Sequence, residues 1–429
     1  MKTSDQKLSA AKRKVIKDIS DFFKNNSEII NEQYFNVIDK TKLPRKFSAI
    51  SDIYEEIDAM QFNKELLDVS IVIITANKFE NDILNHYAYK ENNETKILKL
   101  KNGLDLFANI DFRLVKSFIL SIGQYKILHM HAPETGSNTP CGSADLVRYV
   151  NSNPNLQPSC IISFGVCYGI DCNKQKIGDT IVAKKIYPWS IGLKIDDRDW
   201  KIKHDDFIIN LREHDKRLYD KIEEIIAGDI NQRKDISFSD TETGNILTGE
   251  AVLNNEKKKI EAINRAYGVN ITGGEMEGYG LAKECIYYLN TSCLIIKSIC
   301  DWGACKDIKS YLGDDFPSDV KDDLKDRLQA YAAYCAYTFL KKILYEEIIE
   351  YSSTTNIIKE YLFDNYYKDG VLQEKRLINI ITSKVKKLRN IMLNQTNIDK
   401  MVKDIIYDLV ASDFFETKKS EGIIVYTFK

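Results

Sequence analysis

The feature that most constrains the fold is a continuous run of mostly β-branched residues, LDVSIVIITA, at positions 67–76. A run of this kind, without polar alternation, is typical of a strand covered on both faces. Similar runs follow at 126–130 (KILHM), 160–166 (CIISFGV), 179–186 (DTIVAKKI), 244–249 (GNILTG) and 293–300 (CLIIKSIC). Helical patterns lie between several of them, at Ala144–Asn151, Glu256–Tyr267 and Tyr279–Tyr288. Strands that alternate with helices predict an α/β fold with a twisted, mostly parallel sheet flanked by helices.

The pattern divides the chain into three parts. A length of 429 residues is enough for two or three domains. Residues 1–66 carry apolar side chains at helical spacing and predict an N-terminal helical segment without sheet, which packs on the rest or contacts another subunit. The α/β pattern fills residues 67–345 and ends in a long helix. Residues 346–429 show helical stretches at 354–365, 372–390 and 397–411, then a β-rich end, and predict a winged-helix-like module.

Composition excludes several classes of protein. The 61 basic and 63 acidic residues nearly cancel, so no global charge draws the chain to nucleic acid or to an anionic membrane. No apolar run approaches the ~18–20 residues of a membrane span, and the polar start lacks the apolar centre of a signal peptide. The nine cysteines form no CxxC pair and are expected to be buried, reduced thiols of a cytoplasmic protein. His129 and His131 alone are too few for a metal site, and the sequence predicts neither metal nor cofactor.

The C-terminal part contains one strongly basic stretch. KRLINIITSKVKKLR, at 375–389, carries six basic residues and no acid. A basic helix of this kind can bind nucleic acid, but the tail as a whole is not basic and a solvated helix face has the same pattern. A protein-interaction role is the favoured alternative, so the module is expected to contact a regulatory protein or a nucleic acid.

Acidic side chains follow several of the predicted strands. Glu80 comes just after the first strand, Glu275 and Glu277 lie in the glycine-rich ITGGEMEGYG at 271–280, and Asp301 ends the strand at 293–300. In open α/β sheets, the carboxyl ends of the strands line the ligand crevice. The four acids are therefore expected to converge, although EMEG alone would also fit a helix N-terminus with acids near its dipole.

These segments together resemble the nucleoside phosphorylase/nucleosidase superfamily. The resemblance rests on GEMEGYGLAKE at 274–284, on KSICDWGACKD at 297–307, and on the upstream SFGVCYGID and KIGD, and it covers residues 68–345. It implies the nucleoside phosphorylase-like fold, a purine nucleoside or nucleotide as substrate, and a homo-oligomer. The flanking parts of the chain are not covered by it.

The resemblance also implies roles for individual residues. Met276 matches the residue under the ribose, and Glu277 matches the carboxylate that grips the ribose hydroxyls. Asp301 matches the acid that protonates the purine N7, and Glu80 matches an acid near the attacking water. Further substrate-binding positions implied or inferred for the site are Glu275, Val166, Val252, Tyr187, Lys184, Lys185, Arg148, Lys297 and Lys306.

Some positions depart from the family pattern. Lys297 stands where the family usually has arginine. Val252 stands where the adenosylhomocysteine-type enzymes place an aromatic ring against the base, so stacking would come from Phe79, Tyr187 or Trp302.

The chemistry of an N-glycosidic bond agrees with these roles. Cleavage builds positive charge on the ribose and negative charge on the departing base. A carboxylate against the sugar hydroxyls stabilises the first charge, and a proton donor at N7 relieves the second. Valine at position 166, where many relatives have serine, and a carboxylate at Glu80 disfavour phosphate as the nucleophile. The sequence therefore favours hydrolysis over phosphorolysis.

The segment FGVCYGIDCNKQKIGDTIVAKKIYPW, at 164–189, resembles a subgroup that acts in bacterial antiviral defence. Members of that subgroup release adenine from ATP and related nucleotides. Lysines 184, 185 and 306, and Arg148 one turn inside a helix after a glycine-bearing loop, are candidates for phosphate contacts. Two alternatives stay open. The first is a housekeeping purine nucleoside phosphorylase or a methylthioadenosine/adenosylhomocysteine nucleosidase, and the second is a sensor that binds a nucleotide without cleaving it.

Overall fold

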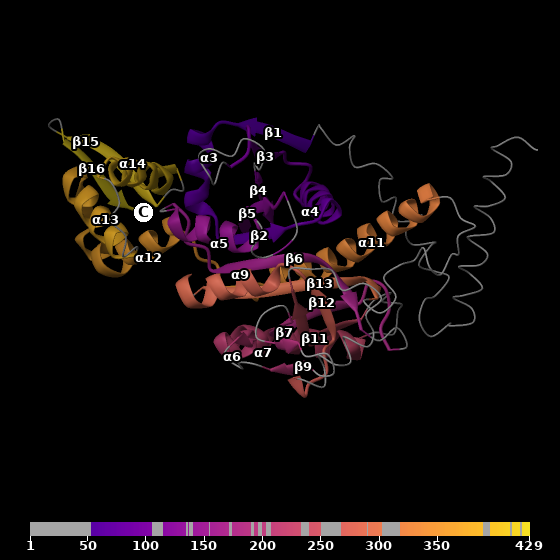
Figure 1. Cartoon of the computed structure of the whole chain (residues 1–429). Coiled ribbons are helices and arrows are strands. Elements are labelled where there is room, and N and C mark those ends of the chain that lie inside the picture. Colours follow the sequence, from indigo (N-terminus) through magenta and orange to yellow (C-terminus); the bar gives the residue numbers. More distant parts are fainter. Residues whose placement is uncertain are drawn as a thin grey trace, which may run out of the picture.

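The computed structural model describes residues 53–104, 115–133, 136, 140–153, 155–170, 174–189, 193–195, 200–202, 207–232, 240–249, 267–289, 291–302, 318–388, 395–411, 414–420 and 423–429. A mixed eleven-stranded sheet lies at its centre, with helices packed around it (Figure 1). In chain order the strands are β1 (Tyr54–Ile57), β2 (Ile71–Thr75), β3 (Ile97–Leu100), β4 (Lys116–Ile122), β5 (Tyr125–His131), β6 (Cys160–Gly169), β7 (Thr180–Pro188), β10 (Ile209–Asn210), β11 (Thr241–Thr248), β12 (Gly273–Glu275) and β13 (Ser292–Trp302).

The sheet confirms the α/β prediction, with parallel strand pairs in a narrow majority. The six predicted strands are all present, as β2, β5, β6, β7, β11 and β13. However, five of the eleven strand pairs in the described part of the sheet are antiparallel. One reason is the hairpin of β4 and β5, which turns at Gly123 with φ of 59°. A two-residue turn of this type needs positive φ and joins antiparallel neighbours. The sequence pattern predicts β5 but not β4, its partner in the hairpin.

One half of the sheet closes on itself. β6 pairs with β12, β12 with β11, β11 with β7, β7 with β13, and β13 again with β6. The five strands therefore form a small closed barrel, while β2, β5, β4, β3 and β1 continue from β6 as an open sheet. The inside of a barrel this small is filled by side chains. Polar groups that point into it must find partners there, which makes the barrel the place where charged residues are most constrained.

Helices cover the sheet. They are α3 (Ala59–Glu65) with the 3₁₀ turn η3 (Leu66–Asp68), α4 (Lys78–Glu91), α5 (Ser143–Ser152), α6 (Leu211–His214), α7 (Lys216–Gln232), α9 (Gly278–Glu284) with a π-helical turn η5 (Cys285–Leu289), and α11 (Ser318–Tyr345). The long helix α11 packs against both α4 and β13. A separate two-stranded ribbon consists of β8 (Leu193–Ile195) and β9 (Trp200–Ile202). Among the described helices, none combines the length and the apolar character that a bilayer span requires.

The N-terminal prediction needs one correction. Residues 1–52 lie outside the described part, but Tyr54–Ile57 form strand β1, which pairs in parallel with β3 at the edge of the main sheet. The predicted segment without sheet is therefore wrong for these residues. The pattern YEEI alternates weakly and is too short to stand out in a helical background.

The C-terminal residues form a unit with its own core. It consists of α12 (Thr354–Tyr366), the 3₁₀ turn η6 (Tyr367–Asp369), β14 (Val371–Gln373), α13 (Glu374–Leu388), α14 (Gln395–Ala411), β15 (Phe415–Ser420) and β16 (Ile423–Phe428), with the strands paired in the order β14–β16–β15. The helices followed by a hairpin agree with the predicted pattern, except that Val371–Gln373 form strand β14 where a helix was predicted from residue 372.

This unit packs against the main body. Leu67 of η3 is part of its apolar core, and the Thr354 hydroxyl donates a 3.0 Å hydrogen bond to the Asn155 carbonyl. On the basic helix α13, Leu377 and Ile381 face that core while Lys375 and Arg376 are exposed. The helix is therefore amphipathic, with its charge on the solvent side.

Candidate active site

Glu80 is fixed at the start of α4, directly after β2. The Asn77 side chain caps the helix, and Glu80 Oε2 accepts hydrogen bonds of 2.9 Å from the backbone N–H groups of Ala76 and Asn77. This reciprocal capping box follows from the local sequence Asn-x-x-Glu. The other oxygen, Oε1, accepts a 2.8 Å hydrogen bond from the backbone N–H of Val166 on β6. The carboxylate is therefore anchored both to the link between β2 and α4 and to strand β6.

Gly165 makes room for this carboxylate. A Cβ atom at position 165 would lie 1.9 Å from Glu80 Oε1, and the residue has a φ of 152°, where L side chains are strained. A glycine in the middle of a strand often marks a close approach of this kind. Glycine at 165 is thus required for Glu80 to reach the barrel.

Glu275 holds the turn between β12 and α9. Its Oε2 accepts 2.8 Å hydrogen bonds from the backbone N–H groups of Glu277 and Gly278, and its Oε1 accepts a hydrogen bond from the Thr248 hydroxyl at the end of β11. The side chain is 5% exposed. Burial raises the pKa of Glu275 to about 7, although the charge of Lys297 acts against this rise. Glu275 is therefore a positioning residue that shapes the backbone before Glu277.

Lys297 lies among these acids. It is on β13, 1% exposed, with Nζ 3.2 Å from Glu277 Oε2 and 3.8 Å from Glu275 Oε2. Burial disfavours the charged ammonium, but the negative charges of Glu277, Glu80 and Glu275 outweigh it and raise the pKa of Lys297. A buried lysine is tolerated when it is paired in this way.

Lys297 has opposite consequences for Glu277 and Glu80. For Glu277, burial favours the neutral acid, but the attraction and the hydrogen bond of Lys297 prevail and lower its pKa. For Glu80, burial prevails over Lys297 and raises the pKa. The cluster thus contains one carboxylate held ionised and two with raised pKa values. Carboxylates whose environments move their pKa values apart are typical of acid–base sites.

Asp301 enters the same region from the carboxyl end of β13. The register of β13 against β6 shifts between Ile299 and Asp301, so that Asp301 lies opposite Tyr168. An irregularity of this kind redirects side chains and is frequent beside active sites. Asp301 is 7% exposed, so its carboxyl group is largely withdrawn from solvent.

Tyr168 connects Asp301 to the other acids. Its ring lies against Gly274 of β12, where a Cβ atom would come within 2.1 Å of the phenol oxygen. Burial raises the pKa of Tyr168, and the negative charges of Glu275 and Asp301 raise it further. Both carboxylates are therefore within electrostatic reach of one phenol. The carboxyl end of β6 is the meeting point of the site, with Val166 binding Glu80 and Tyr168 lying near Glu275 and Asp301.

Two further predicted residues lie at this meeting point. Met276 stands between Glu275 and Glu277 and is half-buried. Val166, also half-buried, contributes its backbone N–H to Glu80. The structure therefore brings Glu80, Val166, the 275–277 segment and Lys297 together, with Asp301 adjacent through Tyr168.

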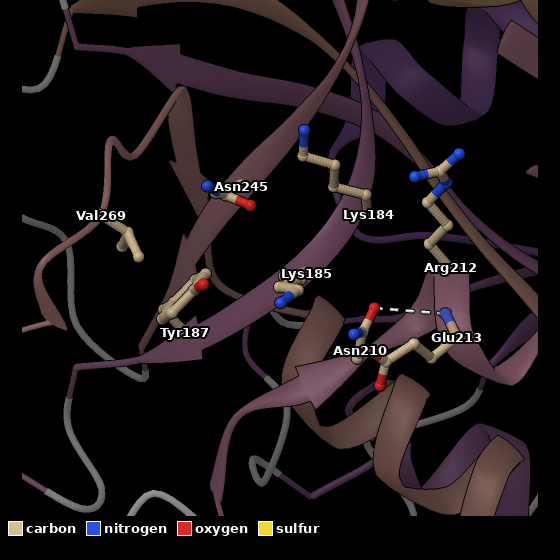
Figure 2. Close-up of a pocket in the computed structure, with 8 residues that line it drawn as sticks. All are labelled: Lys184, Lys185, Tyr187, Asn210, Arg212, Glu213, Asn245 and Val269. Atoms are coloured by element: carbon tan, nitrogen blue, oxygen red, sulfur yellow. Dashed lines mark hydrogen bonds between the residues drawn. The ribbon is translucent and has the colours of Figure 1, made fainter.

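The predicted cations and Tyr187 lie elsewhere. Lys184, Lys185 and Tyr187 line a separate pocket, which none of the four acids lines (Figure 2). Arg148 on α5 forms ion pairs with Asp145 (2.8 Å) and Glu284 (2.6 Å), with its side chain 56% exposed. Arg148 thus joins α5 to the end of α9 that is remote from Glu277. Val252 and Lys306 lie outside the described residues.

Sequence reasoning missed several residues that support the acids. Ser143 donates a 2.6 Å hydrogen bond to the Glu277 carbonyl, and the Gly136 N–H donates a 3.3 Å hydrogen bond to Glu277 Oε1. Thr248 and Tyr168 were missed as well. For Tyr168 the available signal was the pair Gly273–Gly274, because glycines in a strand mark close packing, and Gly274 leaves space for the Tyr168 ring.

His129 and His131 are engaged in a buried polar network. Both rings share hydrogen bonds with the Thr75 hydroxyl, at 2.9 and 3.0 Å, and His129 also contacts Asn85 at 2.8 Å. Burial lowers the pKa of His129 well below its usual value, so the ring is neutral. Within the residues that the structure describes, no group of three or more metal-ligating side chains has a geometry that could hold an ion.

Comparison with known proteins gives similarity only at the level of structure. No protein-family model matches the chain, and no curated protein matches it. Two 5′-methylthioadenosine/S-adenosylhomocysteine nucleosidases are similar in structure. That of Helicobacter pylori has a TM-score of 0.45 and 16% identity over 65% of this chain and 99% of its own. A putative one from Borrelia burgdorferi B31 has a TM-score of 0.44 and 17% identity over 64% and 99%.

Futalosine hydrolase of Helicobacter pylori is similar as well, with a TM-score of 0.41 and 14% identity over 65% of this chain and 98% of its own. Similarity at this level carries no argument about activity. The functional argument therefore rests on the residues of the site.

Proposed function

We propose that this protein hydrolyses the N-glycosidic bond of a purine nucleotide or nucleoside and releases the base. The observation that carries the proposal is the convergence of Glu80, Glu275 and Glu277 on the buried Lys297, at the same end of β6 that faces Asp301. Four carboxyl groups in one small barrel cost considerable desolvation energy. Glu80 and Glu275 also bind backbone N–H groups, but one buried lysine cannot neutralise four acids, so a chemical role explains the arrangement best.

The roles divide according to the environment of each acid. Glu277, held ionised by Lys297, is suited to bind the ribose hydroxyls and to stabilise the positive charge that develops on the sugar. Asp301 is proposed to give its proton to N7 of the purine. The C1′–N9 bond then breaks, and its electron pair leaves with the protonated base.

Water completes the reaction at C1′. We assign the acceptance of its proton to Glu80, because the raised pKa of this buried carboxylate favours a base that works near neutral pH. Phosphate is disfavoured as the nucleophile, since Lys297 is already neutralised by carboxylates and further negative charge would be repelled. Hydrolysis therefore agrees better with the charges of the site than phosphorolysis.

We further propose that the substrate is ATP or a related adenine nucleotide, and that the protein is a cytoplasmic, homo-oligomeric, nucleotide-depleting effector of antiviral defence. Support comes from the resemblance of residues 164–189 to the defence subgroup. The order helix, strand, two helices and hairpin in residues 354–428 is also typical of a winged-helix module, which would contact a regulatory protein or a nucleic acid.

An assay of released adenine tests the proposal. ATP, AMP, adenosine and methylthioadenosine are incubated with the protein, with and without phosphate, and free adenine is quantified. Adenine is expected from ATP or AMP without any need for phosphate. Asp301→Asn is expected to lower the rate by about 10²–10⁴-fold, the usual contribution of general acid catalysis.

The same assay separates the alternatives. Release from methylthioadenosine alone would replace the nucleotide substrate by that of a housekeeping nucleosidase, and a strict phosphate requirement would indicate a phosphorylase. A fully active Asp301→Asn variant would refute the assigned acid. No release from any substrate, with nucleotide binding retained, would indicate a sensor.

A further inference from the structure

A second polar pocket lies where β7, β10 and β11 meet. Its volume is about 390 Å³, within the range of roughly 300–1,000 Å³ typical of small-molecule sites. Figure 2 shows the side chains that line it, namely Lys184, Lys185, Tyr187, Asn210, Arg212, Glu213, Asn245 and Val269. This lining contains three cations and one acid, whereas acids outnumber the single lysine in the barrel.

A strand irregularity brings two consecutive lysines to this pocket. In a regular strand, neighbouring side chains point to opposite faces. Here the pairing of β7 with β11 passes from Ala183–Gly244 to Lys185–Asn245, so that Lys184 is an extra residue on β7. Such a bulge alters the direction of side chains. Both lysines consequently line one cavity.

The cations of the pocket have side-chain N–H groups that form no hydrogen bond within the described residues. Within the described residues, the side chains of Lys184 and Lys185 form neither an ion pair nor a hydrogen bond. Arg212 directs one terminal nitrogen to Asp220 (3.2 Å) and Glu223 (2.9 Å), while its buried Nε has no hydrogen-bond partner in that part of the chain. Glu242 lies near Lys184 and partly offsets its charge. The two lysines, which form no ion pair within the described residues, are available to bind the phosphate groups of a ligand.

The rest of the wall suits a flat heterocycle. Tyr187 and Val269 provide apolar surface, and Tyr187 is held edge-on against Tyr267 at 5.0 Å between ring centres. Asn245 Oδ1 is buried and accepts no hydrogen bond from the described residues. We propose that this pocket is a second nucleotide site, separate from the acids, which binds a nucleoside polyphosphate as an effector.

Asn245 connects the pocket to the barrel. Its backbone N–H donates a 3.2 Å hydrogen bond to the Thr272 hydroxyl, and its carbonyl accepts a 2.8 Å hydrogen bond from the Thr272 N–H, three residues before Glu275. Farther along β11, Thr248 binds Glu275 itself. A ligand that moves β11 would therefore act on the turn that presents Glu277. This effector role rests on the proposed function, whereas the binding site does not.

Calorimetric titration of ATP tests the site. The Asp301→Asn variant serves as the background, so that slow turnover does not disturb the measurement. Adding Lys184→Ala and Lys185→Ala is expected to weaken one ATP site per chain by at least about tenfold. Inorganic tripolyphosphate should bind the same site at least about tenfold more weakly than ATP. The double variant Lys96→Ala and Lys101→Ala, which removes two exposed lysines on either side of β3, is the charge-matched control and should change neither affinity.

The outcomes separate the two proposals. Adenosine has no phosphate and titrates the acid site, so failure of adenosine to bind opposes the proposed function and leaves the second site standing. Unchanged ATP affinity in the double lysine variant would overturn the second site. Equal affinities for ATP and tripolyphosphate would overturn the nucleoside part of the ligand.

The effector role has its own readout. In the unmodified protein, tripolyphosphate is expected to change the rate of adenine release from adenosine, and the double lysine variant should lose this response. A rate that does not depend on tripolyphosphate would overturn it.

Discussion

Lys297 and Lys185 lie on neighbouring strands of one barrel, yet their surroundings are opposite. Lys297 points into the barrel, is 1% exposed and has the carboxylates of Glu277 and Glu275 within 4 Å. Lys185 is half-buried at the edge of a 390 Å³ pocket and has no ion pair within the described residues. The comparison shows that position decides the role of a lysine. The buried lysine fixes the protein's own acids, and the accessible lysine is available to a ligand.

Removing the buried charge should give the largest difference between the two positions. Lys297→Met leaves buried carboxylates without their cation, which typically costs about 3–5 kcal/mol of the free energy of unfolding. Lys185→Met is expected to stay within about 0.5 kcal/mol, as surface substitutions usually do. Urea denaturation of both variants measures the contrast. Equal losses of stability would show that the ammonium of Lys297 is not needed to compensate the acids.

The protonation of Glu275 provides the next test. Its folded-state pKa is raised from 4.5 to about 7, so the native state binds this proton more tightly than the unfolded chain does. The contribution to stability is complete below about pH 4.5 and is lost as pH rises to about 7. The free energy of unfolding is measured for the unmodified chain and for Glu275→Gln at pH 5 and at pH 8. The stability of the unmodified chain relative to the variant should be larger at pH 5 than at pH 8. A difference independent of pH would contradict the raised pKa.

The smallest effect is expected at the surface. Arg148 pairs with Glu284 at 2.6 Å, but its side chain is 56% exposed and solvent screens the pair. Arg148→Ala should lower the free energy of unfolding by about 0.2–1 kcal/mol, with little change in adenine release. Glu284→Ala is the matched control, since the same pair is lost. A much larger effect on activity than on stability would restore Arg148 as a substrate contact.

The secondary structure was largely predictable from the sequence, because local patterns carry it. The buried strands are recognisable in the sequence as apolar runs, and helix α11 is recognisable as a long periodic segment. Strands β1 and β4 were missed, since short or alternating segments depend on a neighbour for their stability. The acids were recognised from a family resemblance. Their hydrogen-bond partners, such as Ser143 and Thr248, lie far away in the sequence and had no local signal.

The sequence by itself determined most of the elements and the acids that are candidates for chemistry. It placed Glu80 in a helix cap through Asn77, a contact between residues three positions apart. Only the tertiary structure decided that the five strands close into a barrel, that Lys297 neutralises acids, and that Lys184 and Lys185 turn to another pocket. The physical reason is distance. Capping and periodicity act between near neighbours in the chain, whereas charge compensation depends on which strands meet in space.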